Sequence, residues 1–154
     1  MNLLIVLGFL AEAILECRDM DGKTLSQIKA VFKAQPAVKL AYFFGSRAEG
    51  LGGPLSDYDF AVYADEKDSK KLFTLRSELM DKLGRLLKTD GVDLVLLNTA
   101  EGAELKFNII AHGRLIFERG HFRVLVEPRI MNEYFDFREM LMRHKLTGTR
   151  RVIA

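Results

Sequence analysis

Apolar and polar residues alternate along the chain in a pattern that predicts buried strands separated by helices. The first apolar run is rich in aromatic residues and lies between Pro36 and Gly45, which is typical of a strand buried on both faces. A later run is almost continuously apolar and is interrupted only by Asp93. The strands are expected at residues 38–44, 58–64 and 92–97, with a short edge strand at 114–117.

Leucines recur at spacings of three and four between residues 66 and 88, with charged residues between them, as in an amphipathic helix. Strands separated by helices around a single core predict an α/β (α+β) domain, with a mixed sheet flanked by helices and a long C-terminal helix. Thr24 is expected to cap the first helix, and Pro128 to lie near the start of the last helix or to kink it. Besides the helix at 66–88, helices are expected at residues 25–34, which Thr24 would cap, at 46–49, at 99–111 and at 121–144, which contains Pro128.

The chain of 154 residues suits one domain at 20–145, preceded by an apolar segment at 1–19 and followed by a tail at 146–154. Residues 3–17 are expected to form a helix that packs on the domain or on a partner. The uncharged run, residues 1–11, is about half the roughly 20 residues that cross a bilayer, and no Lys or Arg precedes it as in a secretion signal. We therefore expect no membrane association. The alternative is that Met20 is the natural start.

Charge and cysteine content narrow the classes of function. The formal net charge of +2 is too small to indicate nucleic acid from bulk electrostatics, so no direct nucleic-acid contact is expected. Cys17 is the single cysteine, which excludes an intramolecular disulfide and favours the reducing cytoplasm. The histidines at 112, 121 and 144 form no spaced set of ligands and are expected at the surface or at helix ends.

Two aspartates at the start of the second strand carry the strongest chemical signal. Asp57 and Asp59 are expected on one face of the sheet, and like charges so close require a proton or a cation. Mg²⁺ is the expected cation, because it takes oxygen ligands and shares them with substrate phosphates. Asp93 is hard to bury in an apolar strand unless it is paired or coordinated, which makes it the expected third ligand. Asp90, in the preceding turn, is the competing candidate for the third metal ligand.

The aspartate pair could instead have a purely structural role, in which Asp57 caps a turn and Asp59 faces solvent. The preceding Gly45 and Ser46 favour the functional interpretation. They lie between a strand and a short helix, where backbone N–H groups suit a triphosphate. Arg47 is near enough to add positive charge to the phosphates, or it pairs with Glu49. The loop is not a Walker A motif, because it lacks the Gly-Lys-Ser/Thr sequence.

Together, residues 43–48, 56–59 and 92–94 resemble the minimal nucleotidyltransferases, or MNT proteins, of the polymerase β-like superfamily. The spacing of ten residues between Gly-Ser and Asp-X-Asp is specific. The resemblance implies Mg²⁺-dependent transfer of a nucleoside monophosphate, usually AMP from ATP, with loss of pyrophosphate. It also implies that Asp57, Asp59 and Asp93 hold the metals and that Gly45 and Ser46 hold the phosphates.

MNT proteins are commonly the antitoxins of HEPN-domain ribonuclease toxins, and some add AMP to a tyrosine hydroxyl of the toxin. Residues 132–138 are similar to the end of such antitoxins. They are also too apolar for a lone terminal helix, so they are expected to pack on the domain or on a partner. We expect an adenylyltransferase of this kind, with ATP as substrate. The alternatives are a binding-only antitoxin or transfer to a small hydroxylated molecule, and homo-oligomerisation stays open.

Overall fold

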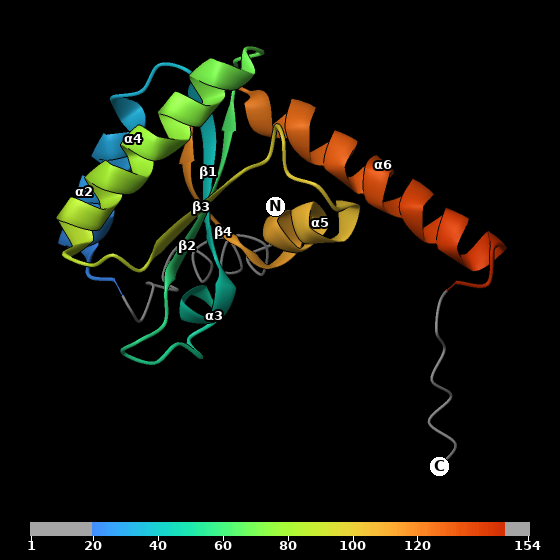
Figure 1. Cartoon of the computed structure of the whole chain (residues 1–154), viewed down its shortest axis with the longest axis horizontal. Helices are drawn as coiled ribbons and strands as arrows, with labels where there is room; N and C mark the ends of the chain where they lie inside the picture. The colour runs from blue at the N-terminus through green and yellow to red at the C-terminus, as the bar shows by residue number, and fades with distance from the viewer. Residues whose placement is uncertain (1–19, 147–154) are drawn as a thin grey trace, which may run out of the picture.

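A computed structural model describes residues 20–146 of the chain (Figure 1). The expected N-terminal helix at 3–17 and most of the expected tail therefore lie outside the described residues. The elements are α2 (Gly22–Lys33), β1 (Val38–Phe44), α3 (Gly45–Ala48), β2 (Tyr58–Ala64), α4 (Ser69–Leu87), β3 (Val92–Leu96), α5 (Ala103–His112), β4 (Arg114–Glu118) and α6 (Phe122–Arg143).

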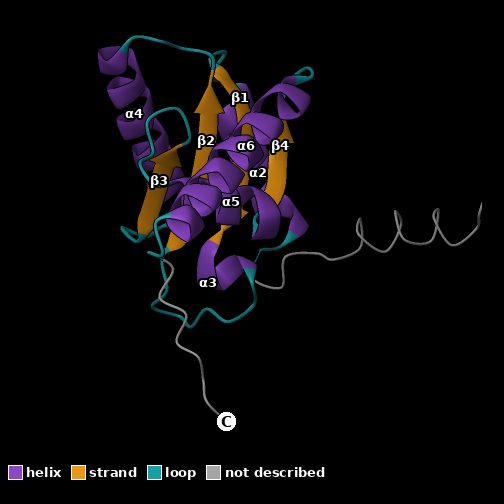
Figure 2. Cartoon of the chain, turned by 90° about the vertical axis from the view of Figure 1, so that its right-hand side faces the viewer, coloured by secondary structure: helices purple, strands orange, loops and turns teal. Residues whose placement is uncertain are grey.

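The strands form one mixed sheet with the order β3-β2-β1-β4, so β3 and β4 are its edges (Figure 2). β1 runs antiparallel to both β2 and β4, whereas β2 and β3 are parallel. Phe44 pairs with Asp59, and Tyr58 pairs with Val92. The end of β1 and the starts of β2 and β3 therefore meet at one end of the sheet, where α3 lies.

Helices cover both faces of the sheet, as the α/β prediction requires. α2 and α4 lie on one face and α5 and α6 on the other (Figure 1). On the α2/α4 side the rings of Phe43 and Phe60 pack with centroids 5.4 Å apart. Burial of an apolar side chain of this size stabilises the fold by about 1.5–3 kcal/mol. The core of the other face contains Leu40, Tyr42, Ala61, Leu97, Ile109, Val126 and Ile130.

The starts of α2 and α5 differ by a few residues from the expected ones, for local reasons. Asp21, and not Thr24, caps α2, because the Asp21 side chain accepts a hydrogen bond of 2.9 Å from the Thr24 backbone N–H. The next segment expected as helix from residue 99 starts at Ala103. The N–H groups of Thr99 and Ala100 instead close a turn onto the Leu96 carbonyl.

A polar network anchors the first half of α6 to the centre of the sheet. The Tyr42 hydroxyl on β1 donates a 2.8 Å hydrogen bond to Glu127 Oε1, which also accepts from Arg123 Nε at 2.9 Å. Burial and the neighbouring Glu127 raise the pKa of Tyr42 above its ordinary value, so the hydroxyl remains a donor. The helix continues through Pro128, which lies inside it.

The second half of α6 extends away from the sheet (Figure 1). Tyr134 stacks on Phe107 of α5 with ring centroids 4.0 Å apart, so this half does pack in part on its own domain. Other large apolar side chains remain exposed: Phe135 by 55%, Met140 by 42% and Met142 by 56%. Within residues 20–146, no helix is both long and apolar enough to cross a membrane.

Candidate active site

Gly45 turns the chain from β1 into α3 and lies against Asp59. Its φ of +79° belongs to the left-handed region, which glycine enters without steric cost. A Cβ atom at this position would overlap the Asp59 carboxylate. Both the backbone conformation and the space therefore require glycine here, and the short helix α3 begins directly beside an acidic side chain.

The parallel pairing of β2 and β3 brings two of the predicted carboxylates together. Asp59 pairs in register with Asp93, and adjacent parallel strands lie about 4.8 Å apart. Asp57 precedes β2, and its Oδ1 lies against Gly91 in the turn before β3. This turn is held in place by a 2.8 Å hydrogen bond from the Tyr58 N–H to the Gly91 carbonyl. The three aspartates expected as ligands thus lie at the same end of the sheet.

The electrostatics of Asp59 show the cost of this arrangement. Partial burial raises the pKa of Asp59 above its ordinary value, and the negative charges of Asp93 and Asp57 raise it further. A bound cation would remove this penalty, because it neutralises the repulsion between the carboxylates. The site therefore favours a positive ligand beside Asp59.

Asp93 is not buried, and that part of the sequence reasoning is wrong. Its side chain is 55% exposed, because β3 is the edge strand of the sheet. An aspartate in an apolar run is tolerated here since one side of the strand faces solvent. The expectation that it lies beside the other aspartates, on a neighbouring strand, agrees with the register. Asp90, its competitor, lies in the turn and is exposed.

Arg76 of α4 holds Asp93, a contact that the sequence reasoning missed. The guanidinium reaches over the edge of β3, where Nε donates to the Leu94 carbonyl at 2.7 Å. Its Nη2 lies 3.4 Å from Asp93 Oδ1. The Asp93 carboxylate also accepts from the Leu94 N–H at 2.8 Å. An arginine on the polar side of a helix that precedes the acidic strand is too common a pattern to single out in sequence.

The three aspartates fit a hard divalent cation in chemistry. Carboxylate oxygens are the ligands that Mg²⁺ prefers, and the charges of Asp93 and Asp57 add to burial in raising the pKa of Asp59. Their side chains do not close around one point, however. Within residues 20–146, no group of three acidic, histidine or cysteine side chains has the geometry to hold a metal ion. Asp57 faces the Gly91 turn, and Asp93 is engaged by Arg76.

Arg47 has a different position from the one expected of a phosphate ligand. Its Nε donates to the Ser56 carbonyl at 2.6 Å, and Nη2 donates to the Pro54 carbonyl at 3.3 Å. The guanidinium also lies over the Tyr58 ring, 4.2 Å from its centroid. Arg47 thus braces the loop that leads into Asp57. Ser46 is exposed in the first turn of α3, beside Gly45.

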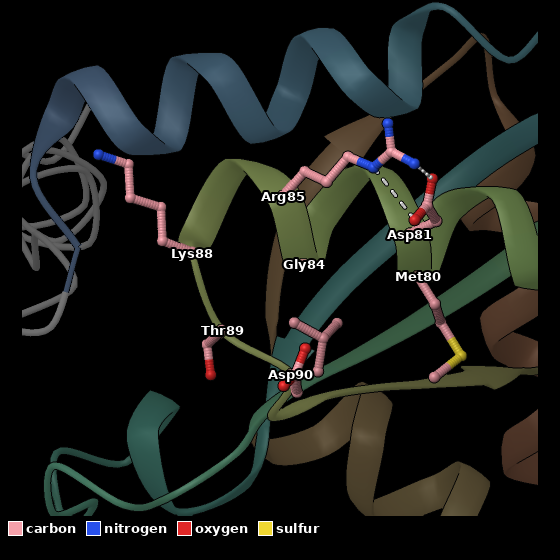
Figure 3. A pocket seen from close by; sticks show the side chains of 8 residues that line it. Met80, Asp81, Gly84, Arg85, Lys88, Thr89 and Asp90 are labelled. Atoms are coloured by element: carbon pink, nitrogen blue, oxygen red, sulfur yellow. Dashed lines mark hydrogen bonds and ion pairs between the residues drawn. The ribbon is translucent and has the colours of Figure 1, made fainter.

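A hollow of about 420 Å³ lies elsewhere, at the turn between α4 and β3 (Figure 3). Its lining contains none of the three aspartates. Two of its charged side chains, Asp81 and Arg85, point toward each other and form an ion pair of 3.1 Å. The three aspartates therefore remain the candidate site, apart from this hollow. Its lining residues are Met80, Asp81, Gly84, Arg85, Lys88, Thr89, Asp90 and Val92.

Comparison with known proteins identifies the family of the chain. A family model described as polymerase beta, nucleotidyltransferase, matches residues 26–121. This range contains the glycine-serine turn and all three aspartates. A comparison with curated proteins finds no match.

Several solved structures are similar to the chain. One is a tri-AMPylated HEPN toxin from Shewanella oneidensis in complex with MNT antitoxin, at 25% identity and a TM-score of 0.60 over 80% of this chain and 93% of that chain. Another is a toxin-antitoxin with AMP-PNP, at 27% identity and a TM-score of 0.65 over 77% and 92%. A third is a mutant toxin-antitoxin complex with two aspartates, two positions apart, changed to glutamate, at 25% identity and a TM-score of 0.65 over 77% and 92%.

Proposed function

Because this chain belongs to the polymerase beta nucleotidyltransferase family, we propose that it transfers AMP from ATP to a tyrosine hydroxyl of a HEPN toxin and thereby acts as an antitoxin. The observation that carries the proposal is the register pairing of Asp59 with Asp93, with Asp57 beside them. The similar structures contain an AMPylated toxin in one case and an ATP analogue in another, which supports both the donor and the acceptor class.

In the proposed reaction, the acceptor oxygen attacks the α-phosphorus of ATP in line with the leaving group. The bond from the α-phosphorus to the bridging oxygen breaks, and pyrophosphate leaves. The hydroxyl proton passes to solvent. Mg²⁺ bound at Asp57, Asp59 and Asp93 would supply neutralisation of the phosphates and a lower pKa for the acceptor hydroxyl.

Gly45 and Ser46 would orient the β- and γ-phosphates. The start of α3 presents backbone N–H groups, and the absence of a side chain at Gly45 lets a phosphate approach the backbone beside Asp59. Ser46 adds an exposed hydroxyl donor. Arg47 contributes by holding the loop that positions Asp57, through the Ser56 and Pro54 carbonyls.

The second half of α6 is the surface proposed to contact the toxin. It projects from the domain and exposes Phe135, Met140 and Met142 (Figure 1). A protein acceptor also agrees with the position of the candidate site, since β3 is an edge strand and Asp57 and Asp93 are exposed.

The test is intact-mass spectrometry of the cognate HEPN toxin after incubation with this protein, ATP and Mg²⁺. We expect the toxin to gain the mass of one or more AMP groups, located on tyrosine by fragmentation. Asp57→Asn combined with Asp59→Asn should abolish the gain while the protein remains folded. An inhibited but unmodified toxin would indicate a binding-only antitoxin and overturn the proposal, as would full transfer by the double mutant.

A further inference from the structure

A second cavity, of about 250 Å³, opens beside the candidate active site on the α5 side of the sheet. It lies between the end of β1 with α3 and the C-terminal half of α5. Its volume is below the range of about 300–1,000 Å³ that is typical of complete small-molecule sites, so it suits one part of a larger ligand. The lining residues are Phe44, Gly45, Glu49, Asn108, His112 and Gly113.

Gly45 connects this cavity to the aspartates. The same glycine that lies against the Asp59 carboxylate forms part of the cavity wall. The opposite wall is brought close by Gly113, where a Cβ atom would lie 3.3 Å from Phe44 Cβ and would overlap the Ile109 carbonyl. A ligand whose phosphates lie at Gly45 therefore has an adjoining cavity within reach of its other end.

The polar side chains that line the cavity have unused hydrogen-bonding capacity. Asn108 and His112 are four residues apart on α5 and so share one face of the helix. Glu49, Asn108 and His112 are all exposed. Within the described part of the chain, none of these three side chains makes a hydrogen bond or an ion pair. Polar groups of both kinds, donor and acceptor, thus surround a space next to the half-buried ring of Phe44.

We propose that this cavity binds the adenine base of the donor nucleotide and that Asn108 and Glu49 select it. This inference rests on the proposed nucleotidyltransferase function and adds the base specificity. An Asn side chain offers one donor and one acceptor, which matches the N7 acceptor and the N6 amino group of adenine. The Glu49 carboxylate accepts a hydrogen bond from the same amino group, and its negative charge disfavours phosphate in this cavity. The Phe44 ring provides an apolar surface against the base.

The same chemistry discriminates against guanine. Guanine carries an oxygen acceptor at position 6, where adenine carries the amino group. That oxygen would face the acceptor oxygen of Glu49 and lose the hydrogen bond that adenine makes. The site should therefore prefer ATP to GTP, and the preference should depend on Asn108.

The test compares Asn108→Ala with the wild-type protein in binding AMP-PNP and GMP-PNP in the presence of Mg²⁺, by calorimetry, and in transfer from ATP and GTP. A good bidentate pair discriminates by about 1–3 kcal/mol, so we expect the ATP to GTP preference to fall by about 10-fold or more. Asn108→Leu should lower the preference as well, and both variants should fold because Asn108 is exposed. Asn132→Ala, at an exposed position of α6, is the matched control and should leave the preference unchanged.

An equal loss of affinity for both nucleotides in Asn108→Ala, or an unchanged preference, would overturn the base assignment. Because binding is measured without an acceptor, this outcome is distinct from failure of the proposed function. A wild-type protein that binds AMP-PNP with an Asn108-dependent preference but modifies no toxin would retain the base site and lose the transfer proposal.

Discussion

Asp59 and Asp93 are register partners on the parallel strands β2 and β3, so their carboxylates lie on the same face of the sheet at adjacent positions. The pairing explains why the pKa of Asp59 is raised, since partial burial and the charge of Asp93 both disfavour its ionised form. It also places the acidic group of an exposed edge strand beside a more buried one. A cation between them would gain from both properties.

Asp59→Asn should stabilise the protein in the absence of divalent metal while it abolishes transfer. The substitution removes a partly buried charge that is repelled by Asp93 and Asp57. We expect a higher Tm than wild type at pH 7 in EDTA, measured by differential scanning fluorimetry. The charge penalty exists above the raised pKa of the folded protein and is relieved as Asp59 takes up a proton, so the difference in Tm should shrink as the pH falls toward about 4.

Asp57→Asn is the control for that measurement, because Asp57 is exposed. It should impair transfer with a much smaller change in metal-free Tm. If Asp59→Asn were less stable than wild type at pH 7, or if its advantage did not depend on pH, the electrostatic description of Asp59 would be wrong.

Gly45→Ala should lower both stability and transfer. Alanine in the left-handed region costs about 1–2 kcal/mol, and the added Cβ would also overlap the Asp59 carboxylate. We expect the free energy of unfolding in urea to fall by at least this amount and transfer to fall by about 100-fold or more, because displacement of a catalytic group by about 1 Å has effects of this size.

Gly50→Ala separates the two causes. Gly50 has a φ of +73°, but a Cβ atom added there would meet no atom of a more distant residue within 4 Å. Gly50→Ala should lower the free energy of unfolding because of the backbone conformation alone, and it should retain AMP transfer. Equal losses of transfer in the two variants would mean that contact with Asp59 is not the reason for glycine at position 45.

Arg76→Gln should weaken metal binding and transfer by about 10-fold, the lower end of the range for residues that hold a metal ligand from outside the coordination shell. The substitution removes the contacts with the Leu94 carbonyl and with Asp93 Oδ1. Mn²⁺ affinity, measured by electron paramagnetic resonance without nucleotide, gives a readout independent of turnover.

Arg85→Gln is the matched control on the same helix, because the Arg85 guanidinium pairs with Asp81, away from the three aspartates, and is 79% exposed. It should leave Mn²⁺ affinity unchanged. Tighter Mn²⁺ binding in Arg76→Gln would instead identify Arg76 as a counterion that competes with the metal for Asp93.

Met140→Glu with Met142→Glu should weaken toxin binding by about 10-fold or more with little change in Tm. Both side chains are exposed, by 42% and 56%, so their replacement costs the isolated domain little, whereas charge in an apolar interface is costly. Surface plasmon resonance with the cognate toxin measures the effect. Phe73→Glu on α4, at a side chain that is 68% exposed, is the control and should bind as wild type does. Equal binding by the double variant would exclude this part of α6 from the interface.

The strands were the most predictable elements. β1 and β2 have the bounds expected from the sequence, because the apolar runs are bounded by Pro36, Gly45 and the turn residues before Tyr58. The starts of α2 and α5 were less predictable, since capping by Asp21 and a turn at Leu96 decide them locally. The exposed apolar half of α6 was expected to need a core or a partner, and Tyr134 packs on Phe107 while Met140 and Met142 stay exposed.

The candidate site was predictable in its residue types and less so in its contacts. Strand alternation placed Asp57 and Asp59 on one face, because it depends only on local backbone geometry. The burial expected for Asp93 was wrong, and the contacts of Arg47 with the Ser56 and Pro54 carbonyls were not predicted. Both depend on which strand is at the edge of the sheet and on how a loop folds back.

Periodicity and spacing along the chain predict the strands, the order of the helices, and three aspartates after a glycine-serine turn with Asp93 on a strand beside Asp59. The exact register of Asp93 with Asp59, the reach of Arg76 to Asp93 at the edge strand, and the position of Asn108 and His112 at a cavity shared with Gly45 depend on the tertiary structure. The physical reason is that strand order, register and the packing of α5 on β1 bring together residues that are far apart in the chain, and no local pattern encodes those distances.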